Sequence, residues 1–232
     1  MTSSGTYAFS PSNGELVLAA YERIQIRAPA IRQEHMLSAR RELNFLFSEM
    51  SNKSPNLWEI TLVSQTLTPG TATYSVNANT IMILDAVITL NQGSANQSDL
   101  YVTPISRTEY MSYASKFTQG RPTIYWFDRL ISPTITLYPV PDSGGPYTLN
   151  YYSCTQMQDA NLAGGETPDV PYRFFDAIVA GMSHRLARIY ATPQMEAQRK
   201  VDATEAWGIA AEQDTENVNF NLAPGLSVYY PK

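Results

Sequence analysis

Carboxylates and histidines are the side chains of this sequence best able to support catalysis or metal binding. Asp85, Asp128 and Asp142 occur in the central part of the chain, and a glycosidase would need two such carboxyl groups roughly 5 to 9 Å apart. Positions at turns and strand edges account for these three residues more simply. His35 and His184 are the two histidines. Each falls in a predicted helix, where a packing or interface role is favoured over metal binding.

The sequence motifs of well-known enzyme classes are absent. There is no GxSxG nucleophile motif, no Walker A loop and no GxGxxG motif, and the run Gln-Glu-His-Met around His35 is not the HExxH zinc motif. Cys154 is the single cysteine, which excludes an intrachain disulfide and a cysteine-cluster metal site. We therefore expect a buried, inert thiol at Cys154, and we expect no cofactor, no metal and no catalytic residue.

Two further groups of side chains could recognise a ligand. Aromatic residues of the predicted strands could form a sugar-binding face, although such residues more often pack across strand pairs. They are Tyr125, Trp126, Tyr138, Tyr147, Tyr151 and Tyr152. Arg185 and Arg188 lie beside His184 and could contact phosphate groups. Salt bridges across a helical interface are the favoured interpretation of these two arginines.

The central part of the chain predicts the strands that would carry these groups. Residues 123–128, 134–138 and 147–153 are rich in β-branched and aromatic side chains and are separated by proline and glycine. We expect them to form three consecutive antiparallel strands. Earlier segments, 57–63, 73–76 and 80–90, are expected to begin the same sheet.

Helical patterns occur on both sides of these strands. Ser12 and Glu15 have capping-box spacing, and Thr192 followed by Pro193 is typical of a helix start. The predicted helices cover residues 13–24, 31–51, 107–115, 171–189 and 193–214. The helix after residue 171 has the most apolar stripe and should be the buried one. One side of the last helix is expected to pack only lightly and could meet a neighbouring subunit.

Together these elements predict an α+β fold. It has a four-helix base made of two helical hairpins, an inserted antiparallel β subdomain and an extended C-terminal arm. The expected divisions are residues 1–56, 57–158, 159–214 and 215–232. A net charge of −5 disfavours tight nucleic-acid binding. Because neither a signal peptide nor a membrane-spanning apolar run is recognisable, we expect a location in the cytosol or in an assembly formed there.

The last residues of the chain have a distinct composition. Their apolar side chains have the spacing of neither a helix nor a regular strand. Burial of each large side chain contributes about 1.5–3 kcal/mol, while ordering each residue costs roughly 1–2 kcal/mol. These two terms nearly cancel, so we expect this arm to become ordered only against a preformed groove on a partner.

Several sequence phrases, taken in order, resemble a known family. They are GELVLAAYERIQIRAPAI, EHMLSARRELNFLFSEMSNKSPNLWEI, TPISRTEY, GRPTIYWFDR, PTITLYPVPD and DTENVNFNLAPGLSVYY. The chain resembles the head-to-tail adaptor proteins of tailed bacteriophages, the neck-ring or tail accessory factors bound beneath the portal in short-tailed phages. The resemblance covers nearly the whole chain.

This resemblance implies a structural virion protein without enzymatic activity. It implies a ring of twelve copies that binds the portal protein, extends the DNA channel and supports tail nozzle, tube or spike proteins. The protein would be assembled in the host cytoplasm and located in the neck, where genomic DNA passes without specific binding and no membrane anchor is used. The implied portal-binding arm residues are Phe220, Leu222, Leu226, Tyr229 and Tyr230. The channel-lining candidates are Glu205, Glu212, Asp214 and Glu216.

Two alternatives remain open from the sequence. The first is a tail-associated cell-wall hydrolase that would use Asp128 or Asp142. The second is a carbohydrate-binding β module that would use the tyrosine-rich sheet. Neither alternative accounts for the C-terminal arm.

Overall fold

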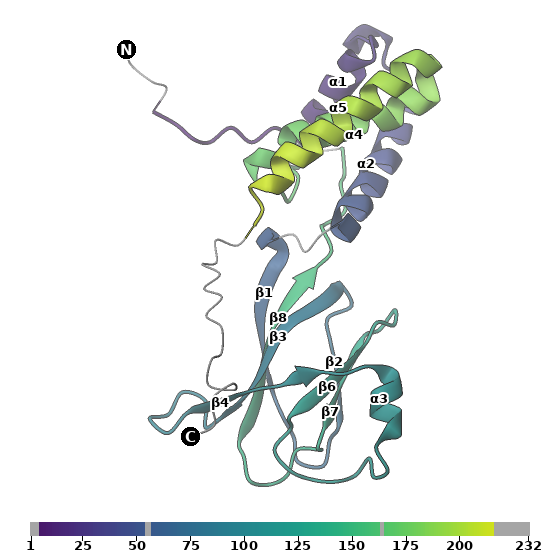
Figure 1. Cartoon of the computed structure of the whole chain (residues 1–232). Helices are drawn as coiled ribbons and strands as arrows, with labels where there is room; N and C mark the ends of the chain where they lie inside the picture. The colour runs from purple at the N-terminus through teal and green to yellow at the C-terminus, as the bar shows by residue number, and fades with distance from the viewer. Residues whose placement is uncertain (1–4, 54–56, 163–164, 216–232) are drawn as a thin grey trace, which may run out of the picture.

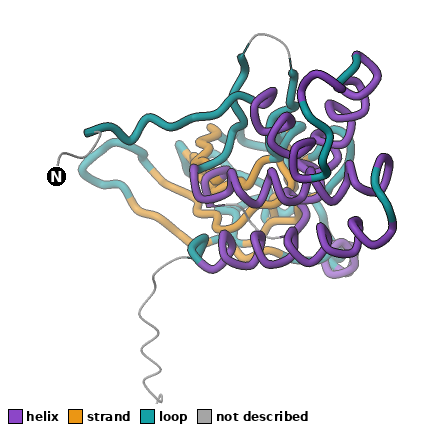
Figure 2. The backbone as a smooth tube through the Cα atoms, turned by 90° about the horizontal axis from the view of Figure 1, so that it is seen from above, coloured by secondary structure: helices purple, strands orange, loops and turns teal. Residues whose placement is uncertain are grey.

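The structure, a computed structural model, describes residues 5–53, 57–162 and 165–215 and has an α+β fold (Figure 1). Four long helices lie at one end of the molecule, and two sheets with one short helix lie at the other (Figure 1). Seen from above, the helices overlie the strands (Figure 2). The α+β class expected from the sequence is therefore confirmed. The expected division of the chain into four parts remains a prediction.

The four long helices, which we call the helical unit, share one hydrophobic core. They are α1 (Asn13–Arg23), α2 (Gln33–Lys53), α4 (Phe175–Tyr190) and α5 (Pro193–Glu212). Both predicted helix starts are confirmed. The Glu15 amide donates to Ser12 Oγ at 3.2 Å, and the Ser12 amide donates to Glu15 Oε2 at 2.7 Å. Thr192 Oγ1 accepts from the Met195 amide at 3.4 Å, with Pro193 in the first turn.

Helix α4 is the central element of the helical unit. Ile178, Met182 and Leu186 on this helix are fully buried, and α4 contacts α1, α2 and α5. Gly181 permits the close approach of α2, because a Cβ atom at this position would lie 2.9 Å from Leu46 Cδ1. The prediction that this helix is the buried one is confirmed.

The strands form two four-stranded sheets. The first has the order β1-β8-β3-β4, with bounds Ile60–Thr66, Tyr147–Thr155, Thr80–Leu90 and Ser98–Tyr101. The second has the order β2-β7-β6-β5, with bounds Thr73–Ser75, Thr134–Tyr138, Ile124–Asp128 and Thr103–Pro104. The pairing is antiparallel except between β5 and β6. Helix α3 (Arg107–Ser112) contacts β6.

The expected run of three consecutive antiparallel strands in one sheet is wrong. Strands β6 and β7 pair with each other, but β8 lies in the other sheet, between β1 and β3. Ile135 and Leu137 of β7 and Leu149 and Tyr151 of β8 are buried in one core that both sheets enclose. Burial of apolar side chains is favourable, and placing β7 and β8 in two facing sheets lets both strands bury their apolar side chains in the same core.

Two sets of contacts join the helical unit to the sheets. On one side, Trp58 of the short 3₁₀ helix η2 (Leu57–Glu59) lies 4.5 Å from the Phe174 ring of η3 (Tyr172–Phe174), centroid to centroid. Trp58 Nε1 also donates to the Asp169 carbonyl at 3.1 Å. On the other side, the chain that follows β8 lies against α2. Asn44 Nδ2 donates to the Ala160 carbonyl at 3.0 Å, and Asn44 Oδ1 accepts from the Ala160 amide at 2.9 Å.

Candidate functional site

The three aspartates considered for catalysis do not form a recognisable acid and base pair. Asp128 forms an ion pair with Arg107 of α3 at 3.1 Å. Asp142 Oδ1 accepts from the Gly144 amide at 2.8 Å and from the Tyr147 hydroxyl at 3.0 Å, which stabilises a turn. Asp85 is exposed on β3. Among residues 5–53, 57–162 and 165–215, no cluster of three or more His, Cys, Asp or Glu residues could bind a metal ion.

The tyrosine-rich strands do not present one exposed aromatic face. Tyr125, Tyr147 and Tyr151 are buried in the core between the sheets. Two more rings are covered by the segment that contains α3: Tyr110 stacks on Trp126 at 5.5 Å, and Tyr113 lies 4.6 Å from Tyr138, centroid to centroid. Only Tyr152, among the six aromatic residues considered, is classed as exposed. A sugar platform of the expected kind is therefore not assembled.

The histidines contact other residues of the helical unit. His35 Nδ1 accepts from the Arg32 amide at 3.1 Å, and its ring lies 4.9 Å from the Tyr190 ring. His184 Nε2 lies 2.9 Å from Glu196 Oε1 and links α4 to α5. Both contacts agree with a packing role.

Arg185 links α4 to α2 through two carboxylates. Its guanidinium donates to Glu42 Oε2 at 3.3 Å and to Glu49 Oε2 at 2.5 Å. Burial alone would raise the pKa of Glu49, but hydrogen bonds from Lys53 and Arg185 lower it. The salt-bridge interpretation of Arg185 therefore agrees with the structure, while Arg188 is exposed at the end of α4.

A buried charged group lies where the helical unit meets the sheets. The Glu59 side chain is buried, and its Oε2 accepts from Thr155 Oγ1 at 3.1 Å. Burial, assisted by the nearby negative charge of Asp169, raises the pKa of Glu59. The Asp214 carboxylate lies at the same junction, where it pairs with Arg173 and accepts from the Leu57 amide at 3.3 Å. These contacts fix the end of the last helix to the start of the sheets.

The four channel-lining candidates have different surroundings. Glu205 and Glu212 are exposed on α5. The Asp214 carboxylate faces Arg173 and is almost fully buried. Glu216 lies outside the described residues, as do all five residues expected to bind the portal: Phe220, Leu222, Leu226, Tyr229 and Tyr230. The channel-lining and portal-binding assignments both remain predictions.

Exposed apolar residues on two helices form the most distinctive surfaces of the helical unit. On α2, Leu37 and Phe45 are 63% and 53% exposed. On α5, Val201 and Ile209 are 56% and 69% exposed. In each helix the two residues are eight positions apart, so they lie on one face, about 12 Å apart along the axis. These four apolar residues were not singled out from the sequence, although one side of the last helix was expected to pack only lightly.

A charged residue lies midway along each of these faces. Arg41 is on α2, four residues after Leu37, and Glu205 is on α5, four residues after Val201. Both are exposed. We call the set Leu37, Arg41 and Phe45 the α2 stripe. We call the set Val201, Glu205 and Ile209 the α5 stripe. Exposed apolar side chains grouped in this way are typical of surfaces that bind other proteins.

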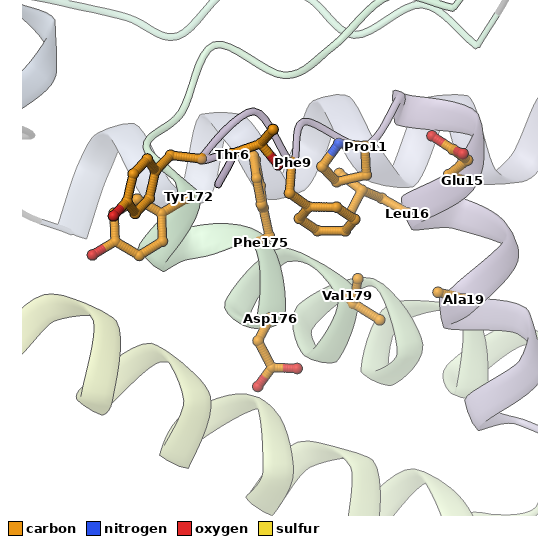
Figure 3. Close-up of a pocket in the computed structure, with 11 residues that line it drawn as sticks. Thr6, Phe9, Pro11, Glu15, Leu16, Ala19, Tyr172, Phe175, Asp176 and Val179 are labelled. Carbon is orange, nitrogen blue, oxygen red and sulfur yellow. The ribbon is translucent and has the colours of Figure 1, made fainter. Parts of the chain in front are cut away.

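A third apolar surface is a hollow beside the N-terminal segment (Figure 3). It has a volume of about 880 Å³ and lies between residues 6–11, α1 and the start of α4. The Phe9 ring contacts the Phe175 ring edge to face at 6.3 Å between centroids, and Tyr172 lies at the rim (Figure 3). Glu15 and Asp176 supply the acidic groups around the hollow.

The sheets carry a further exposed apolar site. Leu130 and Ile131 lie in the turn between β6 and β7, and both are exposed. Met111 of α3 and Phe117, which follows it, are exposed as well. The sheets therefore also offer apolar side chains for contact with another protein.

The fold and these surfaces define a protein suited to assembly with other protein chains. None of the helices within the described residues is long and apolar enough to cross a membrane. Comparison with known families matches residues 31–223 to the SU10 adaptor protein family. This range covers most of the chain, so the protein belongs to that family of phage head-to-tail adaptors, and the resemblance found in the sequence is confirmed. No curated protein matched the chain.

Membership of this family establishes the general role. The protein is a structural adaptor and a component of the phage virion. Adaptors of this kind associate with portal and tail proteins.

Proposed function

We propose that this protein forms a ring of twelve copies directly beneath the portal, in the neck of the virion. The ring extends the DNA channel and carries the tail nozzle, tube or spike proteins. The observation that carries this proposal is the family match over residues 31–223, because it includes three of the four long helices and all of the strands. The exposed apolar faces of the helical unit support it, since a monomer gains nothing from leaving them in water.

In this proposal the two ends of the molecule have separate tasks. The helical unit is the base that forms the wall of the ring. The sheets point toward the tail, and the turn with Leu130 and Ile131 supplies apolar side chains for a lateral contact with the next tail protein. The C-terminal arm binds the portal through Phe220, Leu222, Leu226, Tyr229 and Tyr230. An extended arm with apolar residues can bind a groove or a sheet edge on its partner.

The channel wall is proposed to be acidic or neutral. A basic lining would form salt-sensitive contacts with phosphate groups at every copy of the ring and would slow the movement of DNA. Glu212 is exposed near the end of α5 and suits such a lining. Glu216 follows four residues later in the sequence. Asp214 contributes less, since its charge is paired with Arg173.

Deletion of residues 216–232 tests the portal-binding part of this proposal. The shortened chain is expected to keep the thermal unfolding transition of the full chain, because both hydrophobic cores lie within residues 16–210. It is also expected to stop co-sedimenting with rings of the portal protein from the same phage. The matched control is the full-length chain with Tyr7→Ser, which changes an exposed aromatic residue outside the arm. Unchanged portal binding by the shortened chain contradicts the assignment.

A further inference from the structure

The α2 and α5 stripes have matching geometry and opposite charge. Each has an apolar residue, a charged residue and an apolar residue at intervals of four positions, so each spans about 12 Å along its helix. If the two stripes were placed side by side, Arg41 would lie opposite Glu205. Leu37 and Phe45 would then lie opposite Val201 and Ile209.

The central charges are available for such a contact. Arg41 is exposed, and its one described ion pair is a distant one, 3.7 Å from Nε to Glu42 Oε1. Glu42 already binds Arg185. The Glu205 side chain makes no hydrogen bond or ion pair within the part of the chain that the structure describes. Arg41 therefore has one weak partner that it shares with Arg185, and each stripe supplies a charge opposite to that of the other.

The charge pattern distinguishes the two ways in which copies could meet. A two-fold contact between identical faces would place Arg41 near Arg41, or Glu205 near Glu205, and like charges at an interface are unfavourable. A head-to-tail contact places the α2 stripe of one copy on the α5 stripe of the next. Contacts of that kind form closed rings when the rotation closes.

The neighbouring positions also select the direction of the two helices. If the helices were antiparallel, Glu34 of α2 would lie opposite Glu212 of α5, since each is seven residues from the central charge. If they are parallel, Glu34 lies opposite Gln198, and Glu212 lies opposite Ser48, without repulsion. In a single chain both helices run toward the sheets (Figure 1). Rotation about a ring axis along that direction leaves α2 of one copy parallel to α5 of the next copy.

We propose that the ring is held together by the α2 stripe of each copy packed in parallel against the α5 stripe of its neighbour. This inference rests on the proposed ring. The partner is a second copy of this chain, and the central ion pair is Arg41 with Glu205. Glu205 then belongs to the contact between subunits and not to the channel wall.

Cysteine pairs placed in the two stripes test the contact and its direction. The full chain with Leu37→Cys and Val201→Cys is assembled in particles of the phage that encodes it, and the particles are oxidised. Because each copy carries both cysteines, non-reducing gels are expected to show a ladder of linked copies that continues beyond the dimer. The matched control, Leu37→Cys with Ile209→Cys, is expected to show no ladder. The unsubstituted chain controls for the buried Cys154.

Charge exchange provides an independent measurement. Arg41→Glu is expected to lower the number of copies incorporated per particle at least about tenfold, because like charges then meet at each contact of the ring. Arg41→Glu combined with Glu205→Arg is expected to restore incorporation. Both positions are exposed, so the substitutions leave folding intact.

Several outcomes would overturn the inference. Particles that contain the protein but give no ladder with Leu37→Cys and Val201→Cys would contradict the contact, and equal ladders from the control pair would contradict its direction. Chains that carry Leu37→Cys alone or Val201→Cys alone should give no linked dimers. Failure of the double charge exchange to restore incorporation would contradict the central ion pair. Absence of the unsubstituted protein from the particles would instead contradict the proposed function itself.

Discussion

Replacement of glycine by alanine at two helical positions should have different effects on stability, because only one glycine faces another helix. Alanine is more favourable than glycine inside a helix by about 1 kcal/mol. Nothing lies within 4 Å of a Cβ atom added at Gly208 on α5. Gly208→Ala should therefore raise the free energy of unfolding by about 1 kcal/mol and the melting temperature by about 2–4 °C.

The same replacement at Gly181 must overcome a contact with α2. The added Cβ would lie 2.9 Å from Leu46 Cδ1 and 3.2 Å from Leu46 Cδ2. Overpacking of a core costs about 1–3 kcal/mol, which offsets or exceeds the helix-propensity gain of about 1 kcal/mol. We expect Gly181→Ala to range from neutral to about 2 kcal/mol less stable than the unsubstituted chain.

Urea unfolding followed by far-UV circular dichroism measures both effects. Low protein concentration prevents association from adding to the measured stability. Leu46→Ala with and without Gly181→Ala gives a double-mutant cycle. The loss of the leucine should be less damaging in the Gly181→Ala background, because the added methyl group partly fills the space that the leucine vacates. Equal stabilisation by Gly181→Ala and Gly208→Ala, with no coupling to Leu46, would refute the close packing of α2 on α4.

Three further substitutions test other parts of the structure. Asp214→Asn should lower the free energy of unfolding by about 2–3 kcal/mol, since Arg173 is left partly buried without its carboxylate. Urea titration with and without Arg173→Met measures this change. No loss of stability in Asp214→Asn would contradict the ion pair between Arg173 and Asp214. The raised pKa of Glu59 means that its stabilising contribution is complete below the ordinary value of 4.5 and is lost as the pH rises through the folded-state value. Glu59→Gln should therefore be more stable than the unsubstituted chain at neutral pH but not in acid. If the free energies of unfolding of the two chains changed with pH in the same way, the buried position of the Glu59 carboxyl group would be contradicted. Ile131→Ser should leave the melting temperature unchanged but weaken attachment of the tail protein, as measured by the fraction of particles with tails.

The sequence predicted the elements whose signals are local. Ser12 with Glu15 and Thr192 with Pro193 predicted helix starts that the structure confirms, since a capping group is close in sequence to the amide that it binds. The apolar stripe of α4 predicted its burial, because the spacing of apolar residues along one helix is also a local signal. The strand from Thr134 to Tyr138 was also predicted at its observed bounds.

Features that depend on distant parts of the chain were not predicted. Strand β8 was assigned to the wrong sheet, because its own residues do not indicate whether β1 or β7 is its neighbour. The burial of Asp214 depends on Arg173, forty-one residues earlier. The α2 stripe was not predicted, because the buried residues of the same helix, such as Leu43 and Met50, already explained the helical pattern of the segment. Leu37 and Phe45 gave no separate signal.

Electron microscopy of the full-length chain mixed with the portal protein of the same phage is the decisive test of the proposed ring. We expect portal rings capped on one face by a second ring of twelve copies around a continuous channel, with the sheets directed away from the portal. Portal rings that remain bare, beside a chain that stays monomeric at saturating concentration, would contradict it.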